Sequence, residues 1–422
     1  MENVTDGITV PREKLYRLYP DTDTFEIEKR LNLALDGYRR VYGAGSPRLF
    51  TAPGRTELCG NHTDHQRGLV IAAAVNLDDA AAAEINGEAV IRVFSEEYGA
   101  STVDLSELSP RPDELGTPSA IIRGVSEYFT LQGFPAPRGF NAYISGQVPV
   151  GSGLSSSAAF EVLIACVLNG LFYGGTISPE VMAHAGQYAE NNHFGKPCGL
   201  MDQMASAVGG IIGIDFRHSD KPEIERLPIH FSDYGYALCI IDTGAKHDKL
   251  GDEYAPIPTE MSSVAQLLGG ERLRDLTKER FFEELPHLRG KVSDRALLRA
   301  IHFFSENERV LLGLEALKKK DFESFLQLER ESGLSSYMHL QNIYPSGAVS
   351  DQSAALALAW CERLLGEKGA FRIHGGGFGG TVQAFVPTSS AEQFKTDMEL
   401  LTGAGSCRFH KIRDAGAAEI IL

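Results

Sequence analysis

Apolar residues recur at two periods along this chain, and each period predicts a kind of secondary structure. From Phe25 to Tyr42 the apolar positions follow helical spacing and Gly43 ends the run, which predicts an amphipathic helix. The stretch Ser155–Phe172 has helical composition with overlapping apolar faces, which predicts another helix. Further helices are expected at residues 179–191, 260–268, 306–320 and 353–365.

Shorter apolar runs predict strands. Arg48–Ala52 indicates a short strand that enters Pro53 and Gly54, and the continuous apolar run 68–75 suits a buried strand or the start of a helix. Further strands are expected at 89–94, 139–147, 209–216, 236–242, 371–373 and 382–386. Because helices and strands mix without strict alternation, the pattern favours an α+β fold over a doubly wound sheet.

The length of the chain indicates two domains. At 422 residues it exceeds what a single hydrophobic core usually supports. The polar stretch Arg217–Lys221, followed by Pro222, is the best candidate for a boundary. We therefore expect an N-terminal domain of residues 1–216 and a C-terminal domain of residues 217–422.

Net charge narrows the choice of partners. The chain has 40 Lys and Arg residues against 56 Asp and Glu residues, a net charge of −16. A surface this acidic argues against nucleic acid and against an anionic membrane surface as partners. An anionic ligand would then depend on backbone amides and a few basic side chains.

Cysteine spacing and hydropathy indicate the compartment. The 6 cysteines form no C-x-x-C pair, so we expect reduced thiols rather than a zinc site or a disulfide framework. The N-terminus is polar, and the most apolar stretch, Leu163–Tyr173, is about half as long as a membrane span. These features predict a cytoplasmic location, while the sequence leaves the oligomeric state open.

The stretch Pro149–Ala158 combines two glycines with three serines at the expected start of a helix. Gly151 and Gly153 allow positive φ and a close ligand, and a helix N-terminus presents free N–H groups that suit a polyphosphate. Serine hydroxyls can also hold Mg²⁺ beside the phosphates. The alternative is an ordinary glycine turn with a serine cap. Neither a Walker A lysine nor a dinucleotide fingerprint is present here.

Asp202 is a second candidate, within the segment Gly195–Gln203. An acid among Gly, Leu and Met is poorly placed for solvation, so one interpretation is a carboxylate that works on a substrate hydroxyl. The other interpretation is a loop aspartate that caps a helix at 203–207.

Two further segments have unusual composition. Ala52–Gln66 is a loop-like segment dense in polar residues, which suits a polyol-binding site; a solvated loop, or a metal site of His62, Asp64 and His65, are alternatives. His374–Gly380 has five glycines in seven residues and is either a ligand-facing loop or a tight hairpin. The polar residues of Ala52–Gln66 are Arg55, Glu57, Asn61, His62, Asp64 and His65.

In this order the segments resemble the GHMP kinase superfamily, and most closely its galactokinase family. PGRTELCGNHTDHQRG is similar to that family's N-terminal signature, PVGSGLSSSAAFEV to its phosphate loop, GLMDQMAS to its catalytic-aspartate segment and HGGGFGGTVQAFV to its third glycine motif. Residues 242–254 resemble its sugar-contacting tyrosine segment. The resemblance implies a two-domain fold with the active site in the cleft between the domains.

The resemblance also implies a reaction. It is ATP-dependent phosphorylation of the anomeric (C1) hydroxyl of galactose, which gives galactose 1-phosphate and ADP. A kinase of another sugar or polyol, or a non-catalytic sugar-sensing regulator on the same fold, are the alternatives.

Matching positions imply a role for each candidate residue. Asp202 would take the proton of the anomeric hydroxyl, and Arg55 would stabilise the migrating phosphoryl group. Ser157, or its neighbour Ser156, would hold Mg²⁺ together with Glu190. The implied sugar-binding residues are Asn61, His62, Asp64, Gly199 and Tyr254, and the implied ATP-binding residues are Gly151, Ser152, Gly153, Leu154, Ser155, Ser156 and Ser157.

Four positions depart from the family pattern. The family usually has Asn where Glu57 stands, Glu where Asn61 stands and Tyr where His65 stands. Position 61 contacts the C6 hydroxyl of the sugar in the family, so a sugar altered at C6 becomes plausible. Pro118 stands where the family often has an aromatic residue beside adenine. These departures leave open which sugar and which nucleotide the chain prefers.

Overall fold

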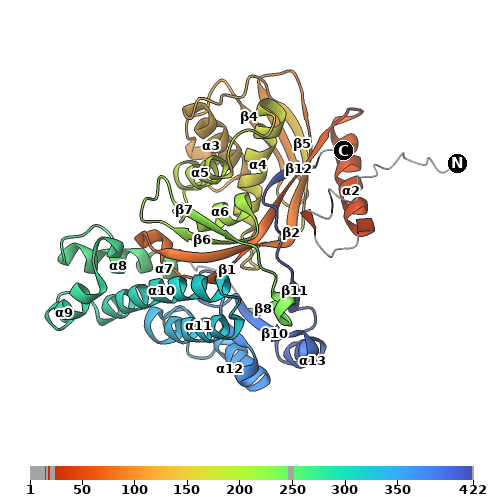
Figure 1. Ribbon diagram of the computed structural model, residues 1–422. Coiled ribbons are helices and arrows are strands. Elements are labelled where there is room, and N and C mark those ends of the chain that lie inside the picture. The colour runs from red at the N-terminus through yellow and green to blue at the C-terminus, as the bar shows by residue number, and fades with distance from the viewer. Residues whose placement is uncertain (1–14, 16–17, 20–23, 246–250, 421–422) are drawn as a thin grey trace.

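The computed structural model describes residues 15, 18–19, 24–245 and 251–420 (Figure 1). Residues 246–250 of the expected tyrosine segment lie outside the described residues, as do residues 1–14. Two sheets organise the described chain. One has eight strands in the path β12-β1-β2-β5-β3-β4, with β6 joining β2 to β7, and the other has four strands in the order β11-β8-β10-β9.

Strands β1 and β2 are the two longest strands of the eight-stranded sheet. β1 (Arg48–Cys59) runs through Pro53 and Gly54 instead of ending there. Its antiparallel pairing with β2 tolerates this because the register shifts between Pro53 and Arg55 and again between Glu57 and Cys59. Residues 52–59 are therefore strand, and the expectation that the whole polar segment is a loop was wrong. The other strands of this sheet are β2 (Leu69–Ile85), β3 (Val90–Ser95), β4 (Gly99–Asp104), β5 (Phe140–Gly146), β6 (Ile211–Asp215), β7 (Glu223–Leu227) and β12 (Ala418–Ile420).

The start of β2 explains its continuous apolar sequence. Val70 and Ala72 pack with the core that contains Leu163, while Ile71 and Ala73 pack with the core that contains Val310. A strand covered on both faces needs apolar residues at every position. Of the two expectations for residues 68–75, a buried strand or the start of a helix, the strand is confirmed.

Helices cover both faces of this sheet (Figure 1). α4 packs on β1 and β2 together with α6, whereas α2 packs on β2 and β5. The helices of this part are α2 (Thr24–Tyr42), α3 (Pro118–Leu131), α4 (Ser156–Tyr173), α5 (Pro179–Ala189) and α6 (Met201–Val208). α4 is long and apolar enough to cross a membrane by length and composition, but 72% of it is buried inside the protein, as in a core helix.

The four-stranded sheet and seven helices form the lower part of the view in Figure 1. The strands are β8 (Tyr236–Asp242), β9 (Ala370–Ile373), β10 (Thr381–Pro387) and β11 (Cys407–His410). The helices are α7 (Gly251–Tyr254), α8 (Pro256–Leu267), α9 (Lys278–Leu288), α10 (Asp294–Lys318), α11 (Phe322–Ser335), α12 (Ser353–Leu365) and α13 (Ala391–Thr402). α10 begins twelve residues before the expected helix at 306–320, since Ser293 caps it by accepting from the amide of Ala296.

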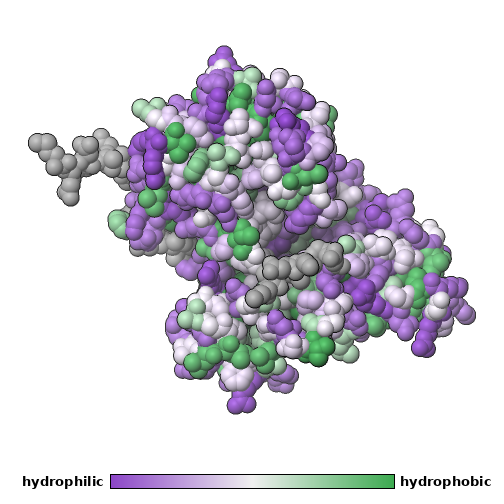
Figure 2. All heavy atoms as spheres, turned by 180° about the vertical axis from the view of Figure 1, so that it is seen from behind, coloured by the Kyte–Doolittle hydropathy of each residue, from purple (hydrophilic) through white to green (hydrophobic). Residues whose placement is uncertain are grey.

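The first sheet draws on residues from both sides of the expected boundary. β7 pairs with β6, and β12 pairs with β1 through Leu49 and Ile420. The division into residues 1–216 and 217–422 stays a prediction. Figure 2 shows one face of the molecule, which is mostly hydrophilic with separate small groups of apolar side chains, in keeping with the charge of −16.

Candidate active site

Residues 149–155, which we call the glycine–serine loop, reach the N-terminus of α4 through three residues with positive φ. Gly151 and Gly153 have φ of 76° and 74°, and Ser155 has φ of 59°. A Cβ on Gly153 would lie 2.4 Å from Thr381 Oγ1 and 2.7 Å from His374 Nδ1, so only glycine lets the loop approach the third glycine motif. Ser155 makes no capping hydrogen bond to α4. The ordinary serine-capped turn is therefore not what the structure contains.

Asp202 and Arg55, 147 residues apart in sequence, form a two-point ion pair. Arg55 on β1 donates from Nε to Oδ1 of Asp202 over 2.6 Å and from Nη2 to Oδ2 over 2.5 Å. Ser155 Oγ donates to the same Oδ2 over 2.6 Å. Asp202 lies in the first turn of α6, which begins without a side-chain cap, so the interpretation of Asp202 as a capping residue was wrong.

These contacts fix the protonation state of Asp202. Burial raises the pKa of this carboxyl, but the charge of Arg55 and the hydrogen bonds from Arg55 and Ser155 outweigh burial, and the pKa lies below its ordinary value. The Asp202 side chain is still 29% exposed. The site thus presents an ionised, reachable carboxylate at neutral pH, which is what a general base requires.

Arg55 also ties the acid to the glycine–serine loop. Its Nη1 donates to the carbonyl of Gly153 over 2.5 Å, and its backbone amide donates to the carbonyl of Leu154 over 2.9 Å. A strand, a loop and a helix therefore meet at one guanidinium: Gly153 of the loop accepts from Nη1, and Asp202 of α6 accepts from the Nε–Nη2 edge.

The polar residues after β1 hold the third glycine motif in place. Asn61 is buried; its Nδ2 donates to Glu57 Oε2 over 2.9 Å and to the Gly375 carbonyl over 2.7 Å. His62 Nε2 donates to the Gly376 carbonyl over 2.9 Å, and the hydroxyl of Tyr254 donates to the Gly377 carbonyl over 3.2 Å. The motif is thus the connecting loop of the β9–β10 hairpin, in which the His374 amide donates to the Thr381 carbonyl over 3.0 Å, and side chains from other elements hold this loop in place.

Asn342 is a member of this network that the sequence did not reveal. Its Nδ2 donates to Asn61 Oδ1 over 2.8 Å and to the Gly376 carbonyl over 3.2 Å. Both amide atoms of Asn61 are therefore already bonded within the protein. Its expected contact with the sugar stays a prediction.

Asp64 and Gly199 adjoin each other. A Cβ on Gly199 would lie 1.7 Å from Asp64 Oδ2, so the absence of a side chain at 199 makes room for this carboxylate. Burial, and next the charge of Asp202, raise the pKa of Asp64 to about 6. Within the described residues no group of three or more His, Cys, Asp and Glu side chains is arranged to hold a metal ion, which leaves the alternative metal site in this segment without support.

A cavity of about 120 Å³ contains the two expected magnesium ligands, Ser157 and Glu190. Glu190 begins a π-helical turn, Glu190–Phe194, after α5, a feature frequent at functional sites. Pro118 lines the same cavity, but aromatic residues from other elements lie with it. The full lining is Tyr98, Gly116, Pro118, Ile121, Ser157, Phe160, Glu161, Glu190 and Phe194.

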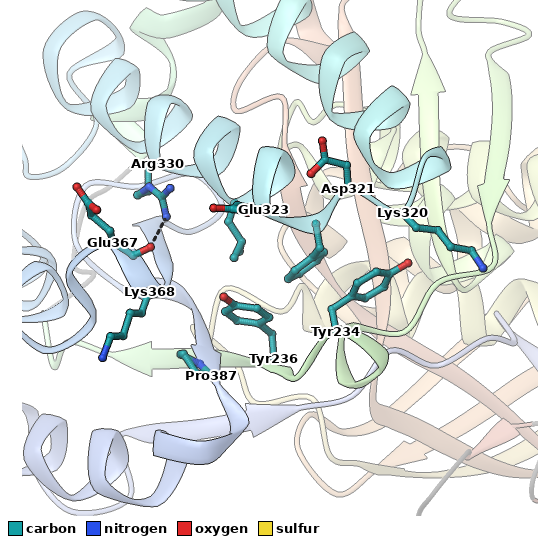
Figure 3. A pocket seen from close by; sticks show the side chains of 11 residues that line it. Tyr234, Tyr236, Lys320, Asp321, Glu323, Arg330, Glu367, Lys368 and Pro387 are labelled. Atoms are coloured by element: carbon teal, nitrogen blue, oxygen red, sulfur yellow. Dashed lines mark hydrogen bonds between the residues drawn. The ribbon is translucent and has the colours of Figure 1, made fainter.

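Two further cavities among the described residues differ in how they relate to this site. One of about 350 Å³ lies between the glycine–serine loop and the four-stranded sheet, with Gly151, Ser152 and Thr381 in its wall. Another, of about 690 Å³, is lined by none of the candidate residues and lies beside Tyr234, Tyr236 and Arg330 (Figure 3). We therefore place the candidate active site at the Arg55–Asp202 pair and not in this larger cavity.

A glycine-rich loop at a helix N-terminus beside an Arg–Asp pair suits phosphoryl transfer, and the family models that match the chain identify its class as the GHMP kinases. Residues 119–210 match the family model "GHMP kinases N terminal domain", and residues 36–85 match "Galactokinase galactose-binding signature". A galactokinase of Actinobacillus pleuropneumoniae is 34% identical over 375 residues, which cover 87% of this chain and 92% of that protein. The chain belongs to the galactokinase family and is a sugar kinase.

Solved structures confirm the expected fold. The crystal structure of Lactococcus lactis galactokinase complexed with galactose matches with a TM-score of 0.78 and 23% identity, over 92% of this chain and 98% of that one. The mevalonate kinase of Methanococcus jannaschii matches with a TM-score of 0.59 and 17% identity, over 88% of this chain and 99% of that one.

Proposed function

We propose that this chain transfers the γ-phosphoryl group of ATP to the C1 hydroxyl of galactose. The observation that carries the proposal is the two-point pairing of Asp202 with Arg55 beside the Gly153 carbonyl. Galactose is supported by the signature matched at residues 36–85 and by the names of the relatives. ATP is supported by the family and by the loop at the N-terminus of α4.

The proposed reaction uses Asp202 as base. The C1 hydroxyl gives its proton to the Asp202 carboxylate while its oxygen attacks the γ-phosphorus, the bond to the bridging oxygen breaks, and ADP leaves from galactose 1-phosphate. Arg55 stabilises negative charge on the transferred group and keeps Asp202 ionised. Phosphoryl transfer depends mostly on such positioning and charge stabilisation.

The remaining residues would hold the two substrates. Gly151–Ser157 would surround the phosphates of ATP. The aromatic lining of the 120 Å³ cavity would hold the adenine ring. Ser157 and Glu190 would hold Mg²⁺, whose contribution when bound is to neutralise charge on the phosphates; their oxygen donors suit this ion. His62, Asp64, Gly199 and Tyr254 would form the sugar site with Asn61.

Release of ADP, measured by a coupled assay with ATP and a panel of sugars, tests the proposal. Galactose turnover supports it, whereas turnover of another sugar alone identifies a different sugar kinase. Binding of ATP and galactose without ADP release would instead support the sugar-sensing alternative.

A variant tests the role of the acid. Asp202→Asn should abolish ADP release while ATP affinity, measured by calorimetry, stays within a few-fold, because the glycine–serine loop is unchanged. Asp36→Asn, on an exposed part of α2 and paired with Arg39, is the matched control and should keep full activity. Full activity of the Asp202 variant would remove this residue as the base.

A further inference from the structure

Glu161 lies deep beside the expected magnesium ligands and has no role in the proposed mechanism. It follows Ser157 by one turn of α4, so the two side chains share a face of that helix. Both line the 120 Å³ cavity together with Glu190. Two carboxylates and one hydroxyl thus converge from α4 and from the end of α5.

The amide of Gln203 separates the two carboxylates. Its Nε2 donates to Glu161 Oε2 over 2.8 Å and to Glu190 Oε2 over 3.1 Å. Gly186 on α5 leaves room for this arrangement, since a Cβ there would lie 3.0 Å from both Gln203 Cγ and Glu161 Oε2. Gly186, Gln203 and Glu161 therefore fit together, with the glycine leaving room for the amide and the acid.

The other oxygen of Glu161 is unsatisfied. Glu161 is 0% exposed, and its Oε1 is buried without a hydrogen-bond partner. A buried carboxylate oxygen without a partner is costly, and such groups in native proteins usually mark a ligand, an ion or a bound water. Lys196 does not fill this gap, because its ammonium pairs with Glu190 over 2.9 Å and its side chain is 63% exposed.

We propose that Glu161 is a second carboxylate of the Mg²⁺ site, acting with Ser157 and Glu190 either on the ion or through one of its waters. The inference rests on the proposed function, because it concerns the metal that accompanies ATP. Mg²⁺ in nucleotide-dependent enzymes is held by one or two carboxylates, substrate phosphates and several waters. The orphaned Oε1 is the oxygen assigned to this task.

The competing explanation is structural: Glu161 would be a neutral acid that only packs between α4, α5 and α6. Glu161→Gln separates the two explanations, because it keeps the shape and removes the charge. The probe is Mn²⁺ in place of Mg²⁺, with the free ion followed by electron paramagnetic resonance during titration of protein plus ADP. We expect Mn²⁺ affinity to fall at least tenfold, in the range typical of lost metal-site partners.

Two further variants complete the experiment. Glu161→Asp keeps the charge and should bind Mn²⁺ more tightly than Glu161→Gln. Glu329→Gln is the matched control, since Glu329 on α11 is also buried with oxygens that lack a hydrogen-bond partner but does not line this cavity, and its Mn²⁺ affinity should equal that of the wild type. Thermal melts establish that each variant folds.

The outcomes distinguish this inference from the proposed function. Wild-type turnover of galactose together with Mn²⁺ affinity within twofold of wild type in folded Glu161→Gln would overturn the inference alone. Equal Mn²⁺ affinity in the Asp and Gln variants would overturn it as well. A wild-type protein that releases no ADP with any sugar would instead contradict the proposed function.

Discussion

Replacing Ser155 with alanine is the most direct test of how the candidate base is oriented. Ser155 has φ of 59° and ψ of 66°, a left-handed conformation that non-glycine residues rarely adopt. In this conformation its hydroxyl donates to Asp202 Oδ2 over 2.6 Å. The strained backbone therefore aims a donor at the carboxylate that we propose as base.

The size of the effect follows from that single hydrogen bond. A hydrogen bond to a charged group contributes about 1.5–3 kcal/mol, but water can replace the donor because the Asp202 side chain is 29% exposed. We therefore expect a loss of about 1–1.4 kcal/mol, which corresponds to kcat/KM about 5- to 10-fold lower. The KM for ATP should change little.

The pH profile shows whether the loss acts through Asp202. The Ser155 hydroxyl favours the ionised carboxyl and so lowers the pKa of Asp202. Without it this pKa rises, and the acid limb of the kcat/KM profile for galactose moves to higher pH. Ser155→Gly removes the same hydroxyl but adopts positive φ freely. Its acid limb should move to higher pH by the same amount, and its free energy of unfolding should exceed that of Ser155→Ala by about 1 kcal/mol. An unchanged acid limb and unchanged kcat/KM in both variants would refute the reasoning.

Three further predictions test separate features of the fold and site. Gly199→Ala forces a methyl group against the Asp64 carboxylate, so the KM for galactose should rise about tenfold while the KM for ATP holds; an unchanged galactose KM would count against the predicted sugar site. Arg372→Met breaks the buried 2.6 Å pair with Glu57 and leaves that carboxylate buried without its cation, so the free energy of unfolding in urea should fall by about 3–5 kcal/mol; an unchanged free energy of unfolding would contradict this expectation. Burial raises the pKa of Asp78, but two buried arginines lower it to about 2. Its stabilisation is present above pH 4 and is lost as the pH falls toward 2, so the wild type should lose about 2 kcal/mol over that interval; a similar loss in Asp78→Asn would assign it to other groups.

The sequence predicted the elements that depend on local pattern. The helix of Phe25–Tyr42 and the strand Tyr236–Asp242 have clear periods, and both are confirmed. β1 could not be predicted past Pro53, since its continuation depends on bulged pairing with β2, which lies in no local pattern. The short strands at the chain end depend in the same way on distant partners.

The site shows the same division. Asp202 was a candidate from the sequence because an acid among apolar residues needs a reason, and in the structure it pairs with Arg55. Glu161 is likewise an acid among apolar residues, the only charged residue between 156 and 173. The helical periodicity of this stretch predicts its apolar faces but gives no role to the acid. Asn342 carried none, because its role depends on the carbonyl of Gly376, which only tertiary structure brings near.

The return of β12 to β1 has a consequence for how the chain is made. On the side away from β2, Leu49, Phe50 and Thr51 pair only with Ala418–Ile420, so this edge of β1 stays unpaired during synthesis until residue 420 has been made. The same strand, a few residues further on, carries Arg55. A fragment that ends at residue 216 would lack β12 and leave this edge of β1 free to pair with another copy. We expect such a fragment to aggregate.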